Sequence, residues 1–330
     1  RCDYFLHSCD DLYLTMVINS ETLPTSKKVL LIDIGGTNVR TCCADIGTSV
    51  LLNPQKVNTS CLNSFDDLIH KFLTEDPLID HIVFSVAGPK VNNSITMTNR
   101  EFTLDADAVL KKFNISSCHI LNDWESIGYS LSLFTDDDMT QIVPGNSFNE
   151  TALIIGPGTG LGAALVIRDN IVLPTEIGNS ILSIDSLMVS STLKNSSDFN
   201  VIEDLISGRG ISNIYRHFSG VEKTSENILL SYQEDEMAKR SIDQFLISLS
   251  QVLSELALAY IPGNGIYLAG GLMRSLRPFI DTDEFIKNFL INRKPMHKDL
   301  LQKISISLIE KEMTCLHGNL NYFNKLIFEK

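Results

Sequence analysis

A unit of strand, glycine-rich turn and strand occurs twice in this chain. The first copy consists of the apolar run Val29–Ile34, the turn GGTN and a second strand over residues 39–46. The second copy starts with the strand Thr151–Ile155 and continues through GPGTGLG into a strand over residues 163–168. A further strand follows each copy. Such a repeat indicates an internal duplication, and we expect two α/β lobes that place the two turns across a central cleft.

Length and the remaining pattern define the expected domains. A chain of 330 residues is long enough for two domains. Apolar residues recur at helical spacing between Ile242 and Tyr260, and a short buried strand follows over 265–269. We treat residues 1–28 as a flexible lead-in. The expected domains are a small α/β domain over 29–122, which a C-terminal helix over 312–330 could complete, and a large α/β domain over 123–311.

Composition excludes several classes of protein. The net charge of −13 argues against a nucleic-acid-binding protein, whose binding face is usually basic. No apolar run approaches the roughly 20 residues of a membrane helix. The seven cysteines are scattered and lack the spacing of zinc ligands. We therefore expect free thiols in a reducing, cytoplasmic environment.

The motif IDIGGTN could form one half of a phosphate-binding site. Gly35 and Gly36 would let the backbone approach an anion, and Thr37 and Asn38 add hydrogen-bond donors. Asp33, at the end of the strand, could hold Mg²⁺ through water. A plain hairpin with a polar tip would explain the same residues. This alternative stays open because the motif is neither a Walker A sequence nor G-x-G-x-x-G.

The second glycine-rich turn, GPGTGLG, contains Gly158, Thr159 and Gly160 and also follows a strand. Alone it could be a β-bulge or a tight turn. Two such turns in matching positions favour a nucleotide phosphate chain, which needs amides from both sides and a carboxylate near the metal. Gly270 and Gly271 follow another short strand, where tandem glycines allow close approach of a group or a positive φ.

Several polar residues at strand ends and in loops could bind or activate a substrate hydroxyl. Asp123 follows Asn122 at the end of a buried strand, where it could act as a general base or simply as the N-cap of the next helix. Glu176 and Glu203 lie near glycines in polar loops. Each could hold sugar hydroxyls or be an ordinary surface acid. Asn99, in TMTNREF, indicates by itself only a loop.

As a set, these motifs resemble those of bacterial-type glucokinases, which belong to the hexokinase/actin-like ATPase superfamily. The resemblance covers the chain from about Val29 to Arg274. The motifs, in the family's order, are IDIGGTNVR, FSVAGP, TMTNREF, ILNDWESI, IIGPGTGLGAAL, LPTEIGN, IEDLISGRGISNIYR and IYLAGGLM. The resemblance implies the two-lobed actin-like ATPase (ribonuclease H-like) fold. The zinc-binding cysteine cluster of the branch that includes many repressors is absent from the sequence, which favours the glucokinase branch.

The resemblance also implies a reaction: ATP-dependent, Mg²⁺-assisted phosphorylation of glucose at its 6-hydroxyl, in glycolysis. Asp123 matches the catalytic base. The residues that match sugar ligands are Asn99, Asn122, Asp123, Glu176, Asn179 and Glu203. Those that match the nucleotide site are Asp33, Gly35, Gly36, Thr37, Asn38, Gly158, Thr159 and Gly160 for the phosphates, and Gly270 and Gly271 for adenosine. A homodimer is expected. Arg40 belongs to the first motif, but physical reasoning assigns it no role.

The chain departs from the family pattern at two places. The family reads Glu-x-Gly-His where this chain reads Glu176-Ile-Gly-Asn179. Asn can hydrogen-bond a hydroxyl, but it has a different reach and cannot take a proton at neutral pH. Sugar preference is therefore open, and a kinase for a different hexose is an alternative. TCLHGNL is a poor match to the glycine-rich start of the family's last helix, so the docking of 312–330 is not predicted.

Two other functions compete with the sugar kinase. Asn179 motivates a catalytically weak sugar-binding or regulatory protein of the same fold. An actin-like ATPase without a sugar substrate would share the phosphate loops but would not need Glu176, Glu203 and the NDW motif. A DNA-binding repressor is disfavoured, because the acidic lead-in cannot hold a basic helix-turn-helix domain.

Overall fold

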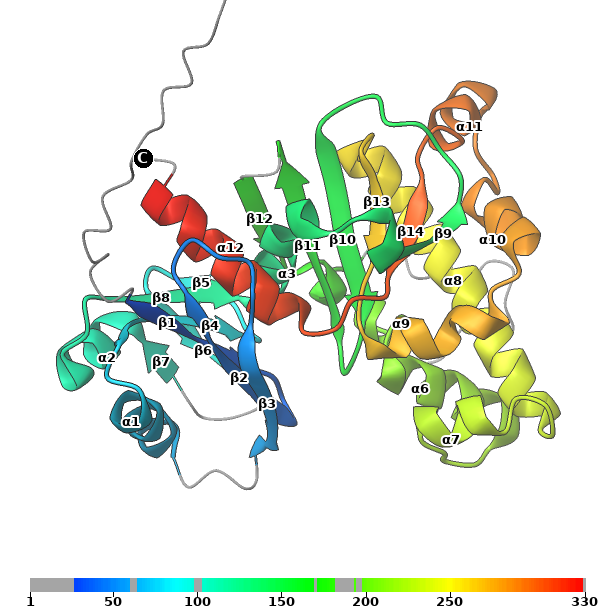
Figure 1. Cartoon of the computed structure of the whole chain (residues 1–330). Helices are drawn as coiled ribbons and strands as arrows, with labels where there is room; N and C mark the ends of the chain where they lie inside the picture. The colour runs from blue at the N-terminus through cyan, green and yellow to red at the C-terminus, as the bar shows by residue number, and fades with distance from the viewer. Residues whose placement is uncertain are drawn as a thin grey trace, which may run out of the picture.

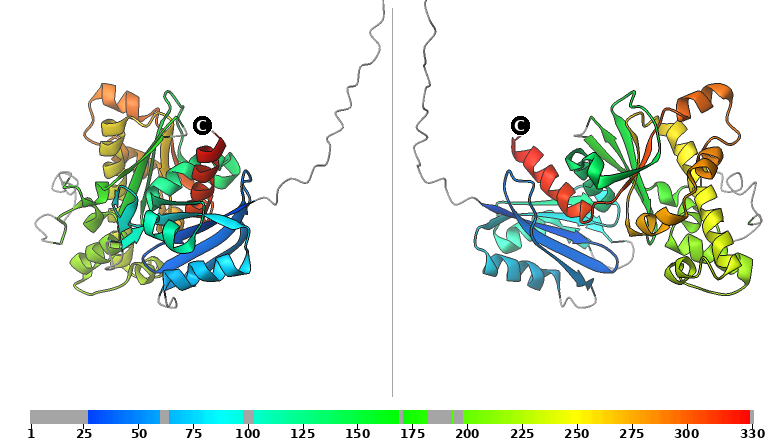
Figure 2. Two further views of the ribbon diagram at one scale, coloured as in Figure 1. Left: turned by 90° about the vertical axis from the view of Figure 1, so that its left-hand side faces the viewer. Right: turned by 45° about the vertical axis from the view of Figure 1, so that its right-hand side comes forward.

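The computed structural model describes residues 27–59, 64–97, 103–168, 171–181, 193 and 198–328. They form two lobes, each built on one mixed β-sheet with helices packed against it (Figure 1). The expected α/β class and the two-lobed arrangement are confirmed. Figure 2 shows from two further sides that the C-terminal helix lies between the lobes.

The first sheet has the strand order β3-β2-β1-β4-β8. Its strands are β1 (Lys28–Ile34), β2 (Asn38–Asp45), β3 (Leu52–Asn58), β4 (Ile79–Val86) and β8 (Ser117–Asn122). The pairs β1–β2 and β2–β3 are antiparallel, whereas β1, β4 and β8 run parallel. Because parallel strands end at the same edge, Asp33 near the end of β1 and Asn122 at the end of β8 lie on one side of this sheet.

Strand β1 is apolar throughout because both faces of the first sheet are covered. The covering helices are α1 (Phe65–Glu75), α2 (Ala106–Phe113) and α12 (Thr314–Phe328). Leu30 and Ile32 pack in the core on the side of α1 and α2, whereas Val29 and Leu31 pack against α12. A strand buried on both faces needs such a continuous apolar run. A small sheet of β5 (Lys90–Val91), β6 (Ser94–Thr96) and β7 (Thr103–Asp105) adjoins this lobe.

The second sheet repeats the topology of the first and adds one strand. Its order is β12-β11-β10-β13-β14-β9. The strands are β9 (Met139–Val143), β10 (Thr151–Pro157), β11 (Leu161–Ile167), β12 (Ile171–Thr175), β13 (Gly265–Leu268) and β14 (Ile306–Ile309). The first two pairings from β12 are antiparallel and the next two are parallel, as in the first sheet. Strand β9 adds an antiparallel edge. The duplication inferred from the two glycine turns is therefore a duplication of whole sheets.

Helix α8 forms the core of the second lobe. The helices among the described residues of this lobe are α3 (Asp123–Ser130), α5 (Ile202–Leu205), α6 (Gly208–Ser219), α7 (Ser225–Leu230), α8 (Glu236–Tyr260), α9 (Gly271–Leu276), α10 (Thr282–Phe289) and α11 (Pro295–Leu301). By length and composition α8 could cross a membrane, but 67% of its most apolar stretch is buried inside the lobe. Its apolar face packs among the strands and the surrounding helices, as in the core of a globular domain.

Two helices, α3 and α12, join the lobes. Helix α3 packs on the second sheet through Ile127, as does Leu131 directly after the helix, and α12 packs on the first through Leu316 and Leu320. The two helices also lie directly against each other. A Cβ on Gly318 of α12 would lie 1.7 Å from the Ser126 carbonyl oxygen of α3, so only glycine allows this approach. We propose to count α12 with the first domain, because its apolar face completes the core of that lobe.

Candidate active site

The two predicted glycine turns occupy equivalent places in the two lobes. In the first, between β1 and β2, the Gly35 N–H donates to the Asn38 carbonyl over 3.0 Å. In the second, between β10 and β11, the Gly158 N–H donates to the Gly160 carbonyl over 2.7 Å. The exposed tips consist of Gly36, Thr37, Gly158 and Thr159. Each turn is thus a hairpin turn whose exposed backbone is open to an anion.

The glycines of GPGTGLG are required for different reasons. A Cβ on Gly160 would lie 2.5 Å from Oε2 of Glu203, and a Cβ on Gly162 would lie 1.6 Å from Nε1 of Trp124. A Cβ on Gly158 would meet nothing within 4 Å. Gly160 and Gly162 therefore make room for neighbouring side chains, and Gly158 is the glycine that borders open space.

Asp33 lies near the end of β1 with both carboxylate oxygens held by donors. Arg40 Nη1 donates to Asp33 Oδ2 over 2.7 Å, and Ser85 Oγ donates to Oδ1 over 3.0 Å. The residue is only 3% exposed. A buried carboxylate needs such partners to remain charged. Arg40 is therefore the counter-ion of Asp33, a role that sequence reasoning missed.

Asn122, and not Asp123, is the N-cap of α3. Its Oδ1 accepts from the N–H groups of Trp124 and Glu125 over 2.9 and 3.2 Å, and its Nδ2 donates to the Gly88 carbonyl over 2.9 Å. The capping alternative therefore falls on Asn122. Asp123 is the first helical residue, and its Oδ1 accepts from the Trp124 N–H over 3.0 Å. One carboxylate oxygen of Asp123 is thus oriented by the backbone.

The environment of Asp123 suits a general base near neutral pH. Its pKa is raised to about 7. The main cause is burial, followed by the negative charge of Asp33 and, to a smaller extent, that of Glu176. The N–H groups of Trp124 and of Asp123 itself oppose the shift. A base whose pKa lies near the working pH is effective in proton transfer.

Glu176 and Glu203 come together around the start of β11. Oε2 of Glu203 accepts from the Leu161 N–H over 3.3 Å. Glu176 precedes the short 3-10 turn η4 (Ile177–Asn179), and a Cβ on Gly178 of this turn would lie 2.3 Å from the Leu161 carbonyl oxygen. Both acids are therefore fixed relative to the strand that leaves the second glycine turn.

Asn179 hydrogen-bonds the carboxylate of Glu176. Burial raises the pKa of Glu176 and the charge of Glu203 adds to this, while the hydrogen bond from Asn179 opposes the rise. The negative charges of Asp33 and Glu176 raise the pKa of Asp123, and the negative charge of Glu203 raises the pKa of Glu176. Four carboxylates from both lobes thus lie within electrostatic range of one another. Such a cluster is suited to accept hydrogen bonds from hydroxyl groups.

Comparison with known proteins identifies the family. The profile of the family described as "Glucokinase" matches residues 30–326. This chain belongs to the glucokinase family. A glucokinase-like protein of Xylella fastidiosa (strain Temecula1) is 27% identical over 319 residues, which are 90% of this chain and 93% of that protein.

Two solved glucokinases share the fold of this family member. A glucokinase from an Antarctic psychrotroph superposes with a TM-score of 0.77 at 21% identity, covering 91% of this chain and 99% of its own. A ROK family glucokinase from Streptomyces griseus, solved with glucose and AMPPNP, superposes with a TM-score of 0.63 at 16% identity, covering 89% and 98%. The predicted resemblance to bacterial-type glucokinases and the predicted actin-like ATPase fold are confirmed.

The structure brings most of the predicted site residues of this glucokinase family member together. Gly270, with a φ of +104°, lies beside Pro157, since a Cβ there would be 3.6 Å from the Pro157 carbonyl oxygen. The Gly270-Gly271 turn is therefore next to the second glycine turn. Asn99, with Thr98, lies outside the described residues. The roles of all these residues in binding and catalysis remain predictions.

Arg209 is a second charged residue that sequence reasoning missed. Its Nη2 donates to Oε1 of Glu203 over 3.3 Å and to Oδ1 of Asp204 over 2.9 Å. Its neighbour Gly208 donates its N–H to the Gly158 carbonyl over 2.8 Å, which joins the start of α6 to the second glycine turn. The only signal in the sequence is the placement of Arg209 in the motif EDLISGRG, six residues after Glu203.

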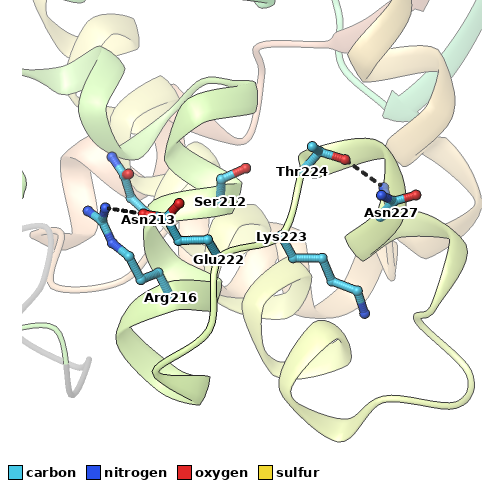
Figure 3. Close-up of a pocket in the computed structure, with 7 residues that line it drawn as sticks. All are labelled: Ser212, Asn213, Arg216, Glu222, Lys223, Thr224 and Asn227. Atoms are coloured by element: carbon cyan, nitrogen blue, oxygen red, sulfur yellow. Dashed lines mark hydrogen bonds and ion pairs between the residues drawn. The ribbon is translucent and has the colours of Figure 1, made fainter.

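A groove of about 460 Å³ lies along α6 and the segment that leads into α7 (Figure 3). Its lining is polar and consists of Ser212, Asn213, Arg216, Glu222, Lys223, Thr224 and Asn227. A Cβ on Gly208 would lie 3.3 Å from Ser225 Oγ and 3.8 Å from Leu272 Cδ2. The start of α6, which lines the groove further along, therefore lies next to the second glycine turn and to Leu272. It does not include the four carboxylates.

The described residues suit a magnesium ion that binds together with a nucleotide. They suit less well a metal ion held by the protein alone. No group of three or more His, Cys, Asp or Glu among them could hold a metal ion. Both oxygens of Asp33 already have protein donors. Mg²⁺ commonly keeps several waters and is held by one or two carboxylates together with substrate phosphates. A water-mediated contact with Asp33 agrees with this chemistry.

Proposed function

We propose that this member of the glucokinase family transfers the γ-phosphoryl group of ATP to the 6-hydroxyl of glucose. Family membership supports a sugar kinase. The observation that carries the finer assignment is the position of Asp123. It begins α3 within electrostatic range of Asp33 and Glu176, and its pKa is raised to about 7. A carboxylate so placed can accept a proton from a hydroxyl at physiological pH.

The sugar lies, in this proposal, between Asp123 and the two glutamates. Glu176 and Glu203 accept hydrogen bonds from ring hydroxyls. The hydrogen bond from Asn179 opposes the rise that burial causes in the pKa of Glu176. Asn122 supports the site indirectly as the helix cap, and Asn99 is retained as a sugar ligand from the family motif.

The chemical step is an in-line displacement. As the 6-oxygen attacks the γ-phosphorus, Asp123 takes the hydroxyl proton, the bond between the γ-phosphorus and the β,γ-bridging oxygen breaks, and ADP leaves with that electron pair. The exposed amides of the two glycine turns hold the phosphate oxygens from both lobes. Asp33 would hold Mg²⁺ through water, and the bound ion would supply neutralisation of the phosphate charge. The solved Streptomyces griseus glucokinase, with glucose and AMPPNP, supports both substrates.

The nucleoside, we propose, occupies the polar groove along α6. The second glycine turn is joined to α6 by the Gly208 N–H, so a phosphate chain held there leads directly to the groove. Ser212, Asn213 and Asn227 offer donors and acceptors to a base or a ribose. The Gly270-Gly271 turn then faces the sugar of the nucleoside.

The cellular setting proposed is a cytoplasmic, glycolytic homodimer. The described cysteines Cys42, Cys43, Cys118 and Cys315 are all free thiols. Burial raises the pKa of Cys42 and of Cys118 to about 12, so neither thiol is reactive at neutral pH. A reducing compartment agrees with both facts.

A coupled ADP-release assay tests the proposal. The full chain is assayed with glucose, mannose, fructose and N-acetyl sugars, each with and without Mg²⁺. We expect ADP release that depends on a hexose and on Mg²⁺, and that is fastest with glucose. ADP release at the same rate without any sugar would instead indicate an actin-like ATPase. A clear preference for another hexose would show that glucose is not the main substrate.

A sugar-binding protein with weak turnover is the second candidate, favoured by Asn179 in place of the family's His. In that case calorimetry would show tight hexose binding while ADP release stays slow with every sugar. The variant Asn179→His then decides whether this substitution is responsible, because it would restore turnover.

A further inference from the structure

A continuous chain of buried hydrogen bonds runs from Asp33 to helix α3. Ser85 Oγ donates to Asp33 Oδ1 over 3.0 Å, and Asn319 Nδ2 donates to Ser85 Oγ over 3.2 Å. The single hydroxyl hydrogen of Ser126 is shared between Asn319 Oδ1, at 2.8 Å from Ser126 Oγ, and the Cys315 carbonyl oxygen, at 2.6 Å. The chain passes from β1 through β4 and α12 to α3. It therefore connects the first lobe to the helix that carries Asp123.

The neighbours of Asn319 determine how its side-chain amide is oriented. Asn319 Nδ2 also donates to the Ile32 carbonyl over 3.4 Å. A carbonyl can only accept, so the amide nitrogen of Asn319 faces β1 and its oxygen faces α3. The hydroxyl of Ser85 is then left to donate to Asp33. Only a side chain with a donor at one end and an acceptor at the other completes this chain.

The network is closed to solvent. Ser85, Ser126 and Asn319 are 0% exposed, and Asp33 is 3% exposed. In such surroundings a hydrogen bond is stronger than in water, and an unpaired polar group is costly. The network therefore resists relative displacement of β1, α12 and α3.

We propose that Asn319 is a positioning residue that sets the placement of Asp33, beside the first phosphate loop, relative to α3 and its catalytic base Asp123. This inference rests on the proposed function. Asp33 and Asp123 belong to different lobes, and both must meet the reacting phosphoryl group and hydroxyl. A displacement of about 1 Å at such a site can cost on the order of a hundredfold in rate. Asn319 touches neither substrate. We therefore expect that removing its side chain lowers kcat more than it changes KM.

Asn321 provides a matched control on the same helix. It is 9% exposed, and its Nδ2 donates to the Tyr129 carbonyl over 2.6 Å and to Ser132 Oγ over 3.1 Å. It thus also joins α12 to α3 and the turn after it, but these two hydrogen bonds lead away from Asp33. Asn319→Ala and Asn321→Ala remove the same groups and differ in whether the bond leads to the site.

The test is steady-state kinetics of both variants beside the wild type. For Asn319→Ala we expect kcat to fall on the order of ten- to hundredfold, with the hexose KM within about threefold of wild type. For Asn321→Ala we expect kcat within about twofold of wild type, even where stability is lost. Equal kcat values for the two variants would overturn the inference.

A double-mutant cycle covers the case in which Asn319→Ala does not fold. Ser85→Ala and Ser126→Ala are small changes at the two ends of the Asn319 side chain. If Asn319 transmits position between them, their effects on kcat are not additive, whereas additive effects contradict the inference. If the wild type releases no ADP with any hexose, the proposed function is wrong and the inference fails with it. An active wild type with additive serine variants refutes only the inference.

Discussion

Asp33 and Arg40 are cross-strand partners in the first hairpin, and their side chains form a buried ion pair. The pairing register of β1 and β2 places the two residues opposite each other, and Arg40 Nη1 lies 2.7 Å from Asp33 Oδ2. The side chain of Arg40 is 33% exposed and that of Asp33 is 4% exposed. The arginine therefore lies between the buried carboxylate and the surface.

Arg40→Met should destabilise the protein strongly. Removing one partner of a buried pair leaves an uncompensated charge, which typically costs about 3–5 kcal/mol. The control is Lys71→Met, since Lys71 and Glu75 form a largely exposed pair at 4.0 Å. Such a pair contributes at most about 1 kcal/mol. Chemical denaturation of both variants measures the difference, and equal midpoints would show that the Asp33–Arg40 pair is not needed for stability.

The activity should depend on pH through Asp123. A general base must be deprotonated, and its pKa is raised to about 7, so kcat should fall on the acid side with an apparent pKa near this value. Glu176, whose pKa is also raised, adds to the loss at low pH. The profile of kcat between pH 5.5 and 9 measures this effect. A flat profile down to pH 5.5 would exclude a base with the environment described.

Asp123→Asn should stabilise the protein at alkaline pH. The folded-state pKa lies above the ordinary value of 3.8, so the native state binds the proton more tightly than the unfolded chain does. Burying the charged form is therefore a cost that appears as pH rises from about 4 to 7 and stays constant above 7. Each pKa unit corresponds to about 1.4 kcal/mol. We expect a higher Tm than wild type at pH 8 and no difference at pH 4.

Gly318→Ala should destabilise the protein although alanine is the better helix former. Its Cβ would lie 1.7 Å from the Ser126 carbonyl oxygen, so α12 must move away from α3. Such overpacking costs about 1–3 kcal/mol or more, against a propensity gain of about 1 kcal/mol. Gly271→Ala is the control, since its Cβ would meet nothing closer than 4.0 Å. Thermal unfolding should separate the two variants, and a Gly318→Ala protein as stable as wild type would contradict the close packing.

Asn179→Ala should weaken hexose binding more at pH 6 than at pH 8. Burial and the charge of Glu203 raise the pKa of Glu176, and the hydrogen bond from Asn179 partly offsets this rise. Without this bond the pKa of Glu176 rises, and a larger fraction of the acid is protonated and unable to accept two hydroxyl hydrogens. Calorimetric titration at both pH values measures the effect. An affinity loss that is the same at pH 6 and pH 8 would show that Asn179 acts only by direct contact.

Sequence predicted the parts of the fold that repeat or follow a strong periodicity. The two strand–turn–strand units indicated the duplication, and helical spacing indicated α8, because both patterns are local. The sequence suggested that a C-terminal helix could complete the first domain, but it did not predict how α12 docks. It depends on a close approach at Gly318 and on Asn319, whose partners Ile32 and Ser126 are far away in the sequence. Such contacts leave no periodic signal.

Sequence reasoning predicted the site residues that stand in recognisable motifs. It missed the arginines that form ion pairs with the acids of the site. Asp123, Glu176 and Glu203 stand in motifs with recognisable neighbours. Arg40 could have been found, because a hairpin centred on the glycine turn places residue 40 opposite residue 33. Arg209 could not, since its contact with Glu203 depends on how α5 and α6 meet.

The most direct measurement is the comparison of wild type with Asp123→Asn in catalysis and in sugar binding. Trp124, the single tryptophan of the chain, adjoins Asp123 and packs against Gly162, so its fluorescence can report binding at the site. We expect hexose-dependent ADP release by the wild type, and a loss of kcat on the order of 10²–10⁴-fold in the variant. The hexose dissociation constant, read from Trp124, should stay nearly unchanged. A variant that retains wild-type kcat would contradict the assignment of Asp123 as the base.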